Sequence, residues 1–185
     1  MYAGCAPSTS APITNSFSNR NAPDTANVSG LFEVSPYGTV GSWTGIDLKW
    51  KDSTGIVRAM SSDSGKVVLL SFWITRPDTG AWVEYSLDSV QQDLGDSVGI
   101  VTVAEDDNYS DNFTSVYDYV KTNKIPLQVV LDSLEFAHVQ YSELANGDLG
   151  LPETFVMRPN GSIMNFFEGY TSEHFLDSAA RAAYH

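Results

Sequence analysis

The feature that most constrains the fold is a continuous apolar run over residues 66–74, KVVLLSFWI. The run is too short for a buried helix and is rich in β-branched residues. It therefore predicts a central strand that is covered on both faces. A strand of this kind is typical of a sheet with helices packed on each side.

Helical and strand patterns alternate after this run. Val83, Leu87, Val90 and Leu94 lie on one face of an amphipathic helix, and Gly95 is placed to end it. Further strands are expected over residues 98–103 and 127–131, with a hairpin of residues 154–157 and 162–167. Further helices are expected over residues 113–120 (capped by Asp111), 135–144, and near the C-terminus, where Thr171 or Ser172 begins a helix with Phe175, Leu176, Ala179 and Ala183 on one face.

Residues 31–56 hold short apolar–polar alternations broken by glycine and proline, and residues 47–51 alternate most cleanly. From residue 66 the predicted order is β-α-β-α-β-α-β-β-α. This order implies an α/β fold in which a mixed central sheet carries helices on both faces. The short strands before it form an N-terminal extension.

Composition excludes several classes of function. The chain has 23 acidic and 10 basic residues, a formal net charge of −13. This balance argues against nucleic acid as a partner, because phosphate binding depends on clustered Lys and Arg. No run of eighteen apolar residues occurs, so no segment of the sequence is expected to span a membrane.

Residues 1–30 differ from the rest of the sequence. Residues 6–30 are rich in Ser, Thr, Asn, Ala and Pro without a periodic pattern, which predicts a flexible tether before a domain at residues 31–185. Tyr2-Ala3-Gly4-Cys5 resembles the end of a lipobox, where a cysteine becomes the lipidated first residue of a lipoprotein. A chance Ala-Gly-Cys in a tail is the alternative. The lipobox interpretation predicts a lipid anchor on Cys5 and a location outside the cytoplasm.

Two motifs resemble the thioredoxin-like family, specifically its membrane-tethered extracytoplasmic branch of the TlpA/ResA type. Residues 65–75, GKVVLLSFWIT, are similar to the strand that enters the active site of that family. Residues 150–156, GLPETFV, are similar to its cis-proline segment, and residues 160–163 to the turn that follows. The resemblance covers about residues 45–184 and implies a thioredoxin-like fold with a cis bond before Pro152.

The sequence departs from this family at the active site. Pro77 and Gly80 occupy the two positions that match the family's Cys-x-x-Cys, and Cys5 is the only cysteine in the sequence. Thiol–disulfide exchange needs one thiolate to attack a disulfide and a second thiol to resolve the mixed disulfide. We therefore expect no catalytic residue and no cofactor.

Other chemistry at the same positions lacks support. His138 or His174 alone makes a poor copper site, and no metal is expected. Glu105-Asp106-Asp107 with Asp111 matches no calcium-binding loop and indicates a solvated turn with a helix cap. No nucleophile-elbow motif is present that would indicate a Ser-His-Asp triad.

The resemblance also implies a groove at which the cis-proline segment pairs with a peptide. The residues expected to line it are Trp73, Arg76, Asp78, Trp82, Leu151 and Pro152. In the alternative interpretation Trp73 and Trp82 are packing aromatics, and Arg76 and Asp78 are loop surface.

Two functions follow. One is a redox-inactive module that binds a protein or peptide outside the cytoplasm. The other is an oxidoreductase family member that uses a thiol supplied by a partner.

Overall fold

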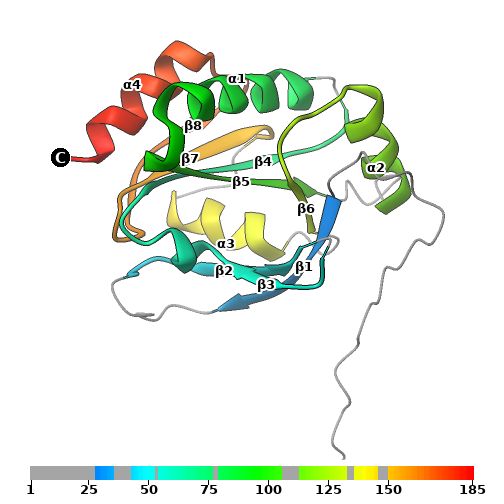
Figure 1. The fold of residues 1–185 in the computed structure, drawn as a ribbon, viewed down its shortest axis with the longest axis horizontal. Helices are drawn as coiled ribbons and strands as arrows, with labels where there is room; N and C mark the ends of the chain where they lie inside the picture. Colours follow the sequence, from blue (N-terminus) through cyan, green and yellow to red (C-terminus); the bar gives the residue numbers. More distant parts are fainter. Residues whose placement is uncertain are drawn as a thin grey trace, which may run out of the picture.

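The computed structural model describes residues 28–35, 43–52, 54–76, 79–105, 113–132, 136–145 and 150–185. Strands and helices alternate through most of these segments (Figure 1). The strands are β1 (Val28–Ser35), β2 (Asp47–Lys51), β3 (Val57–Ala59), β4 (Val67–Trp73), β5 (Val98–Glu105), β6 (Val129–Asp132), β7 (Glu153–Met157) and β8 (Ile163–Glu168). The helices are α1 (Thr79–Leu94), α2 (Phe113–Thr122), α3 (Phe136–Leu144) and α4 (Glu173–Ala183), with 3-10 turns at Met60–Asp63 and Gly95–Ser97.

The strands form one mixed sheet in the order β3-β2-β1-β6-β5-β4-β7-β8. Strands β4, β5 and β6 are parallel neighbours, and β7 runs antiparallel to β4. Strand β4 is buried along its whole length, as its apolar run predicts. The predicted α/β class with a mixed sheet between helices is confirmed.

Two hydrophobic cores lie on opposite faces of this sheet. One is built from α1, α2 and α4 packed on residues such as Leu69 and Val129. The other packs α3 against residues such as Leu70 and Phe155. Figure 1 shows α1 and α4 above strands β4 and β5, and α3 below these two strands. Successive residues of β4 alternate between the two cores because side chains of a strand point to opposite faces.

The N-terminal boundary differs from the expected one. Strand β1 begins at Val28, three residues inside the segment predicted to be a tether. Val28, Ser29 and Gly30 pair in parallel with residues 129–131 of β6. Backbone pairing of this kind needs no apolar–polar alternation, so the composition of the segment did not indicate it.

The predicted face of the C-terminal helix is partly wrong. Leu176, Ala180 and Ala183 are buried, but Phe175 is 61% exposed. Residues 176, 180 and 183 are separated by four and three positions, which is the spacing of one helix face, and Phe175 lies beside it. Ser172 immediately precedes the helix, as one of the two predicted starts.

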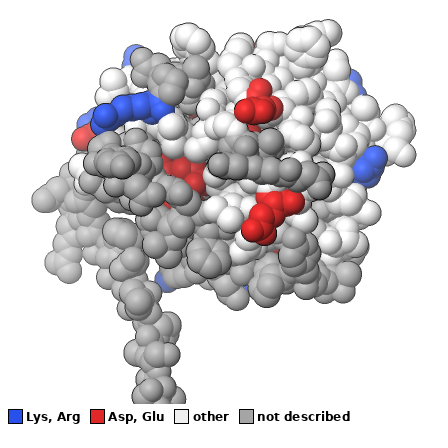
Figure 2. Space-filling view, turned by 180° about the vertical axis from the view of Figure 1, so that it is seen from behind, with Lys and Arg blue, Asp and Glu red and all other residues white. Residues whose placement is uncertain are grey.

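Charged side chains are spread thinly over the face seen in Figure 2. Acidic groups lie toward its middle and basic groups near its edge, and most of its described surface is uncharged. Within the described residues, no helix combines the length and apolarity that a membrane span requires.

Candidate binding site at the cis-proline edge

The candidate site lies at the end of the sheet where the inner strand β4 ends, and we call this end the cis-proline edge. Phe72 pairs with Glu153 in the antiparallel β4–β7 register, so Pro152 comes opposite Trp73 one step further along. The two segments singled out in the sequence are therefore neighbours in the fold. Pro77 and Asp78 lie outside the described residues.

Gly80, which matches the second cysteine of the family motif, lies in the first turn of α1 directly over Trp73. A Cβ atom at this position would be 2.7 Å from Trp73 Cε3 and 2.8 Å from the Ile74 carbonyl oxygen. Side chains do not tolerate such short contacts, so even an alanine requires Trp73 or the backbone to move.

Trp73 itself is fully buried, so the expectation that it lines a groove is wrong and the packing alternative holds. Its ring lies 5.6 Å from that of Tyr119 on α2. The Tyr119 hydroxyl in turn accepts a hydrogen bond of 3.2 Å from the Ala81 amide near the start of α1. Helix N-termini leave such amides unpaired, and in thiol enzymes they favour a thiolate. Here the hydroxyl of a tyrosine from another helix accepts the hydrogen bond of one of these amides.

The Leu151–Pro152 bond is cis, as predicted from the resemblance. The Pro152 carbonyl accepts a hydrogen bond of 2.6 Å from the Gly169 amide, and the Gly150 amide donates to Glu168 Oε1 at 3.1 Å. Between these two anchors, the Leu151 backbone makes no hydrogen bond with the part of the chain that the structure describes. The N–H and C=O groups of Leu151 are therefore available to a ligand at this end of the sheet.

Trp82 and Arg76 lie on the surface at the same edge. Trp82 is 57% exposed on α1, and its ring meets that of Tyr170 edge-on at 6.1 Å. Tyr170 directly follows Gly169, whose amide donates a hydrogen bond to the Pro152 carbonyl. Arg76 is exposed just after β4, whereas Leu151 is half-buried and Pro152 buried. Of the six predicted groove residues, three thus have exposed or half-buried side chains at this edge.

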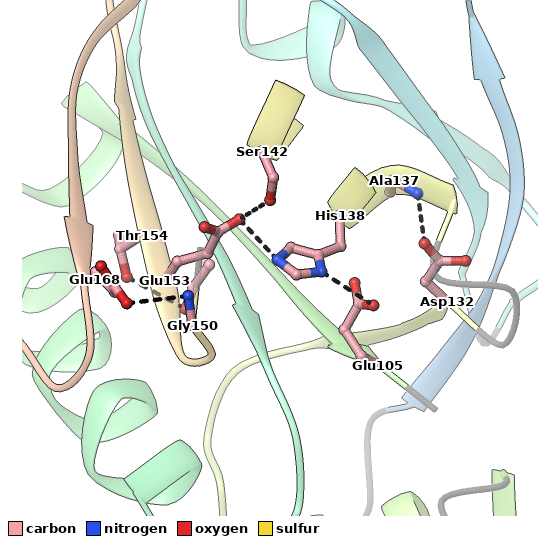
Figure 3. A network of polar contacts seen from close by, with 10 residues as sticks. Glu105, Asp132, Ala137, His138, Ser142, Gly150, Glu153, Thr154 and Glu168 are labelled. Atoms are coloured by element: carbon pink, nitrogen blue, oxygen red, sulfur yellow. Dashed lines mark hydrogen bonds and ion pairs between the residues drawn. The ribbon is translucent and has the colours of Figure 1, made fainter. Parts of the chain in front are cut away.

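Beneath the cis-proline segment, on the α3 face, a histidine lies between two buried carboxylates (Figure 3). His138 Nε2 is 3.2 Å from Glu153 Oε1, and His138 Nδ1 is 3.7 Å from Glu105 Oε2. Glu153 and Glu105 are both at most 1% exposed. Each of these contacts is an ion pair when the imidazole carries a proton on both nitrogens.

Neighbouring groups support this network. The Ser142 hydroxyl lies 3.3 Å from Glu153 Oε1 and is oriented to donate to it. The Phe72 ring packs 5.5 Å from the imidazole. At the start of α3, Asp132 accepts a hydrogen bond of 2.6 Å from the Ala137 amide. Since Glu153 follows Pro152 directly, the network holds the cis-proline segment from below.

The sequence did not reveal this network. Glu105 was interpreted as part of a solvated turn, and that interpretation is wrong because its side chain is buried at the end of β5. Asp106, Asp107 and Asp111 lie outside the described residues. His138 was considered only as a copper ligand, and its side chain is 12% exposed between the two carboxylates. The three groups come from β5, α3 and β7, so only the fold brings them together.

A further carboxyl, that of Glu84, is buried on the α1 face with Thr102 beside it. Burial raises the pKa of Glu84 from 4.5 to about 8, and the Thr102 hydroxyl lowers it in part. Thr102 directs its hydroxyl to the Gln128 carbonyl at 3.2 Å. Glu84 is therefore held mostly as the neutral acid at pH 7. Nothing in the helical pattern of α1 marked this position as functional.

No group of three His, Cys, Asp or Glu side chains in the described ranges is arranged to hold a metal ion. The two nitrogens of His138 face carboxylates on opposite sides of the ring, which leaves neither nitrogen for a metal shared with them. His174 lies apart on α4.

These observations define the class. A sheet with parallel β4–β5–β6, an antiparallel β7–β8 hairpin, a helix that starts after β4 and a cis-proline that opens β7 together make a thioredoxin-like fold. The prediction of that fold is confirmed.

Solved structures of low sequence identity share the fold. StoA from Bacillus subtilis is 22% identical with a TM-score of 0.60, covering 78% of this chain and 98% of its own. A putative thiol:disulfide interchange protein DsbE from Chlorobium tepidum is 20% identical with a TM-score of 0.60, covering 74% and 92%. The exposed lipoprotein thioredoxin Etrx1 from Streptococcus pneumoniae is 16% identical with a TM-score of 0.61, covering 74% and 98%. No protein-family model and no curated protein matches the sequence.

Proposed function

We propose that this chain is a redox-inactive thioredoxin-like protein that binds a protein or peptide at its cis-proline edge. The observation that carries the proposal is the contact between Gly80 and Trp73. A position that merely lost its cysteine would leave room for a side chain, whereas here a Cβ would be 2.7 Å from the indole ring. This close contact supports an interior that serves packing rather than thiol chemistry at this point.

The binding part of the proposal rests on the cis-proline segment. The Leu151 backbone has a donor and an acceptor unused among the described residues, between anchors at Gly150 and Pro152. An extended peptide can pair with such a backbone as an added strand. Glu153 and its buried neighbours keep this segment in place.

We place the protein outside the cytoplasm, held by a lipid on Cys5. This part rests on the lipobox-like Tyr2-Ala3-Gly4-Cys5 and on the similarity to Etrx1, which is described as an exposed lipoprotein. A Cys5→Ser substitution removes the thiol to which the lipid would be attached, and it should release the protein from the membrane fraction. Unchanged fractionation of the Cys5→Ser variant would contradict lipidation.

Photo-crosslinking tests the binding site directly. A photo-reactive residue replaces Arg76 beside the cis-proline edge, and in a matched control it replaces Arg158, an exposed arginine at the opposite end of the sheet. We expect a discrete partner to be trapped from position 76 and not from position 158 in cells of the source organism. Equal trapping at both positions, or none at 76, would contradict a site at this edge.

The alternative function is thiol–disulfide exchange with a thiol supplied by a partner. It is favoured by the structural similarity to a thiol:disulfide interchange protein. An insulin-reduction assay separates the two functions, with Cys5→Ser as the control. Activity that requires a cysteine of this chain would overturn the redox-inactive proposal, and activity only when a partner is added would support the alternative.

A further inference from the structure

A groove of about 670 Å³ lies between α1 and the start of α4 and is lined in part by Trp82, Tyr85 and Tyr170. The two helices lie side by side on one face of the sheet (Figure 1). These three aromatic side chains are 44–57% exposed, and Phe175 next to the groove is 61% exposed. Exposed aromatic groups gathered at one hollow are a typical mark of an interaction site.

The charges lining this groove are mainly negative. Asp93, Glu173 and Asp177 contribute carboxylates, and no Lys or Arg is among the lining residues; His174 is the one basic side chain there. Arg181 neutralises Asp177 through a contact of 2.8 Å. Arg181 also interacts electrostatically with Asp93. Glu173 forms no ion pair within 4 Å among the described residues, so it is the lining carboxylate open to a cationic ligand.

The aromatic geometry favours a compact cation over a flat ligand. The Trp82 and Tyr170 rings are nearly perpendicular, at 83°, and form a corner rather than a platform. A guanidinium or ammonium group is attracted to the face of Trp or Tyr, and more strongly where a carboxylate is near. Arginine and lysine side chains fit this combination, whereas a sugar ring stacks best on a flat aromatic surface.

The groove continues from the cis-proline edge. Tyr170 follows Gly169, whose amide is bound to the Pro152 carbonyl at 2.6 Å. Trp82 belongs both to this edge and to the groove. A peptide that pairs with Leu151 would thus pass next to the Trp82–Tyr170 corner.

We propose that the groove between α1 and α4 binds a cationic peptide segment, with an Arg or Lys side chain at the Trp82–Tyr170 corner and its charge facing Glu173. This inference rests on the proposed function in that the segment belongs to the partner at the cis-proline edge. It adds the chemistry of that partner: a basic, extended segment.

The test uses the full chain and a synthetic peptide of alternating Arg and Ser, with a Glu-Ser peptide of equal length as the charge control. Affinity is measured by calorimetry, and the location by acrylamide quenching of tryptophan fluorescence. Of the four tryptophans, Trp43, Trp50 and Trp73 are at most 8% exposed, so quenching reports on Trp82. We expect the Arg-Ser peptide to bind and to protect Trp82, and the Glu-Ser peptide to do neither.

Matched variants separate the groove from the overall negative charge. Glu173→Gln and Glu143→Gln each remove one carboxylate from an exposed helical glutamate, but Glu143 lies on α3 across the sheet. We expect Glu173→Gln to weaken the Kd about threefold and Trp82→Ala about tenfold, with Glu143→Gln changing it by less than about twofold. Raising the salt concentration from about 50 to 500 mM should weaken binding as well.

Three outcomes would overturn the inference: no binding of the Arg-Ser peptide, equal weakening by Glu173→Gln and Glu143→Gln, or protection of Trp82 by a neutral oligosaccharide instead. The crosslinking experiment at Arg76 is independent of these outcomes. A partner trapped at Arg76 whose capture is unaffected by Glu173→Gln and Trp82→Ala would leave the binding function intact and refute the cationic chemistry. Peptide binding in the groove without capture at Arg76 would support the cationic chemistry of the groove and contradict the binding site at the cis-proline edge.

Discussion

Buried acidic side chains have different neighbours on the two faces of the sheet. On the α1 face, Glu84 is buried with only a hydroxyl beside it, and its pKa rises to about 8. On the α3 face, Glu105 and Glu153 are equally buried but bracket His138 at 3.7 and 3.2 Å. Burial without a cation favours the neutral acid, whereas a positive neighbour stabilises a carboxylate. The α1 face thus buries one acid without a basic neighbour, and the α3 face buries two acids around an imidazole next to the cis-proline segment.

His138→Ala tests the α3 face in this comparison and should have the largest effect on stability. The substitution leaves Glu105 and Glu153 buried without the imidazole between them, and breaking a buried ion pair costs about 3–5 kcal/mol. We expect this loss in the free energy of unfolding by urea at pH 7. His174→Ala on the exposed surface of α4 is the control. Equal stability of the two variants would show that the network contributes little.

Glu84→Gln tests the neutral side through its pH dependence. The folded pKa of Glu84, about 8, lies above its value of 4.5 in the unfolded chain, so the native state binds the extra proton between these values. The stability from this group is complete below pH 4.5 and declines as pH rises toward 8, by about 1.4 kcal/mol for each pH unit. Between pH 5 and 7 the native protein should lose about 3 kcal/mol that the Gln variant does not lose.

Urea unfolding at several pH values measures this difference. Glu143→Gln, on the exposed side of α3, should leave the pH dependence of the native protein unchanged. Parallel stability curves for the native protein and Glu84→Gln would mean that Glu84 is ionised in the folded state, and the contrast between the two faces would then disappear.

Gly80→Ala tests whether the α1 face is packed as tightly as the distances indicate. The new methyl group must displace the Trp73 ring or the Ile74 carbonyl, and overpacking of this kind costs about 1–3 kcal/mol. Trp73→Phe should relieve the clash, so the double variant should lose less than the sum of the single variants. Thermal unfolding of the four proteins measures this coupling. Strict additivity would contradict the packing that carries the redox-inactive proposal.

Ser142→Ala should have the smallest effect of the set. It removes one hydroxyl, 3.3 Å from Glu153 Oε1, and leaves the His138 contact in place. A loss of about 1 kcal/mol in the free energy of unfolding is expected. A loss as large as that of His138→Ala would mean that the hydroxyl, rather than the imidazole, holds Glu153.

Much of the fold could be predicted from local pattern. The apolar run of β4 and the spacing of Val83, Leu87 and Val90 specify their elements because burial of one face is encoded at fixed intervals along the chain. The segment around Pro152 could be located by its motif. The start of β1 and the exposure of Phe175 were not predictable in this way, since both depend on which distant strand or helix lies alongside.

The sequence by itself determined that residues 31–185 contain no cysteine and that a cis-proline segment follows a thioredoxin-like core. Which side chains meet at the candidate sites was settled only by the tertiary structure. The Trp73 ring beneath Gly80, the histidine between Glu105 and Glu153, and the corner of Trp82 and Tyr170 each join residues from separate elements. Periodicity records which face of an element is buried, but not which side chains meet there. These side-chain contacts are set by strand register and by the packing of helices on the sheet, and both depend on all the elements together.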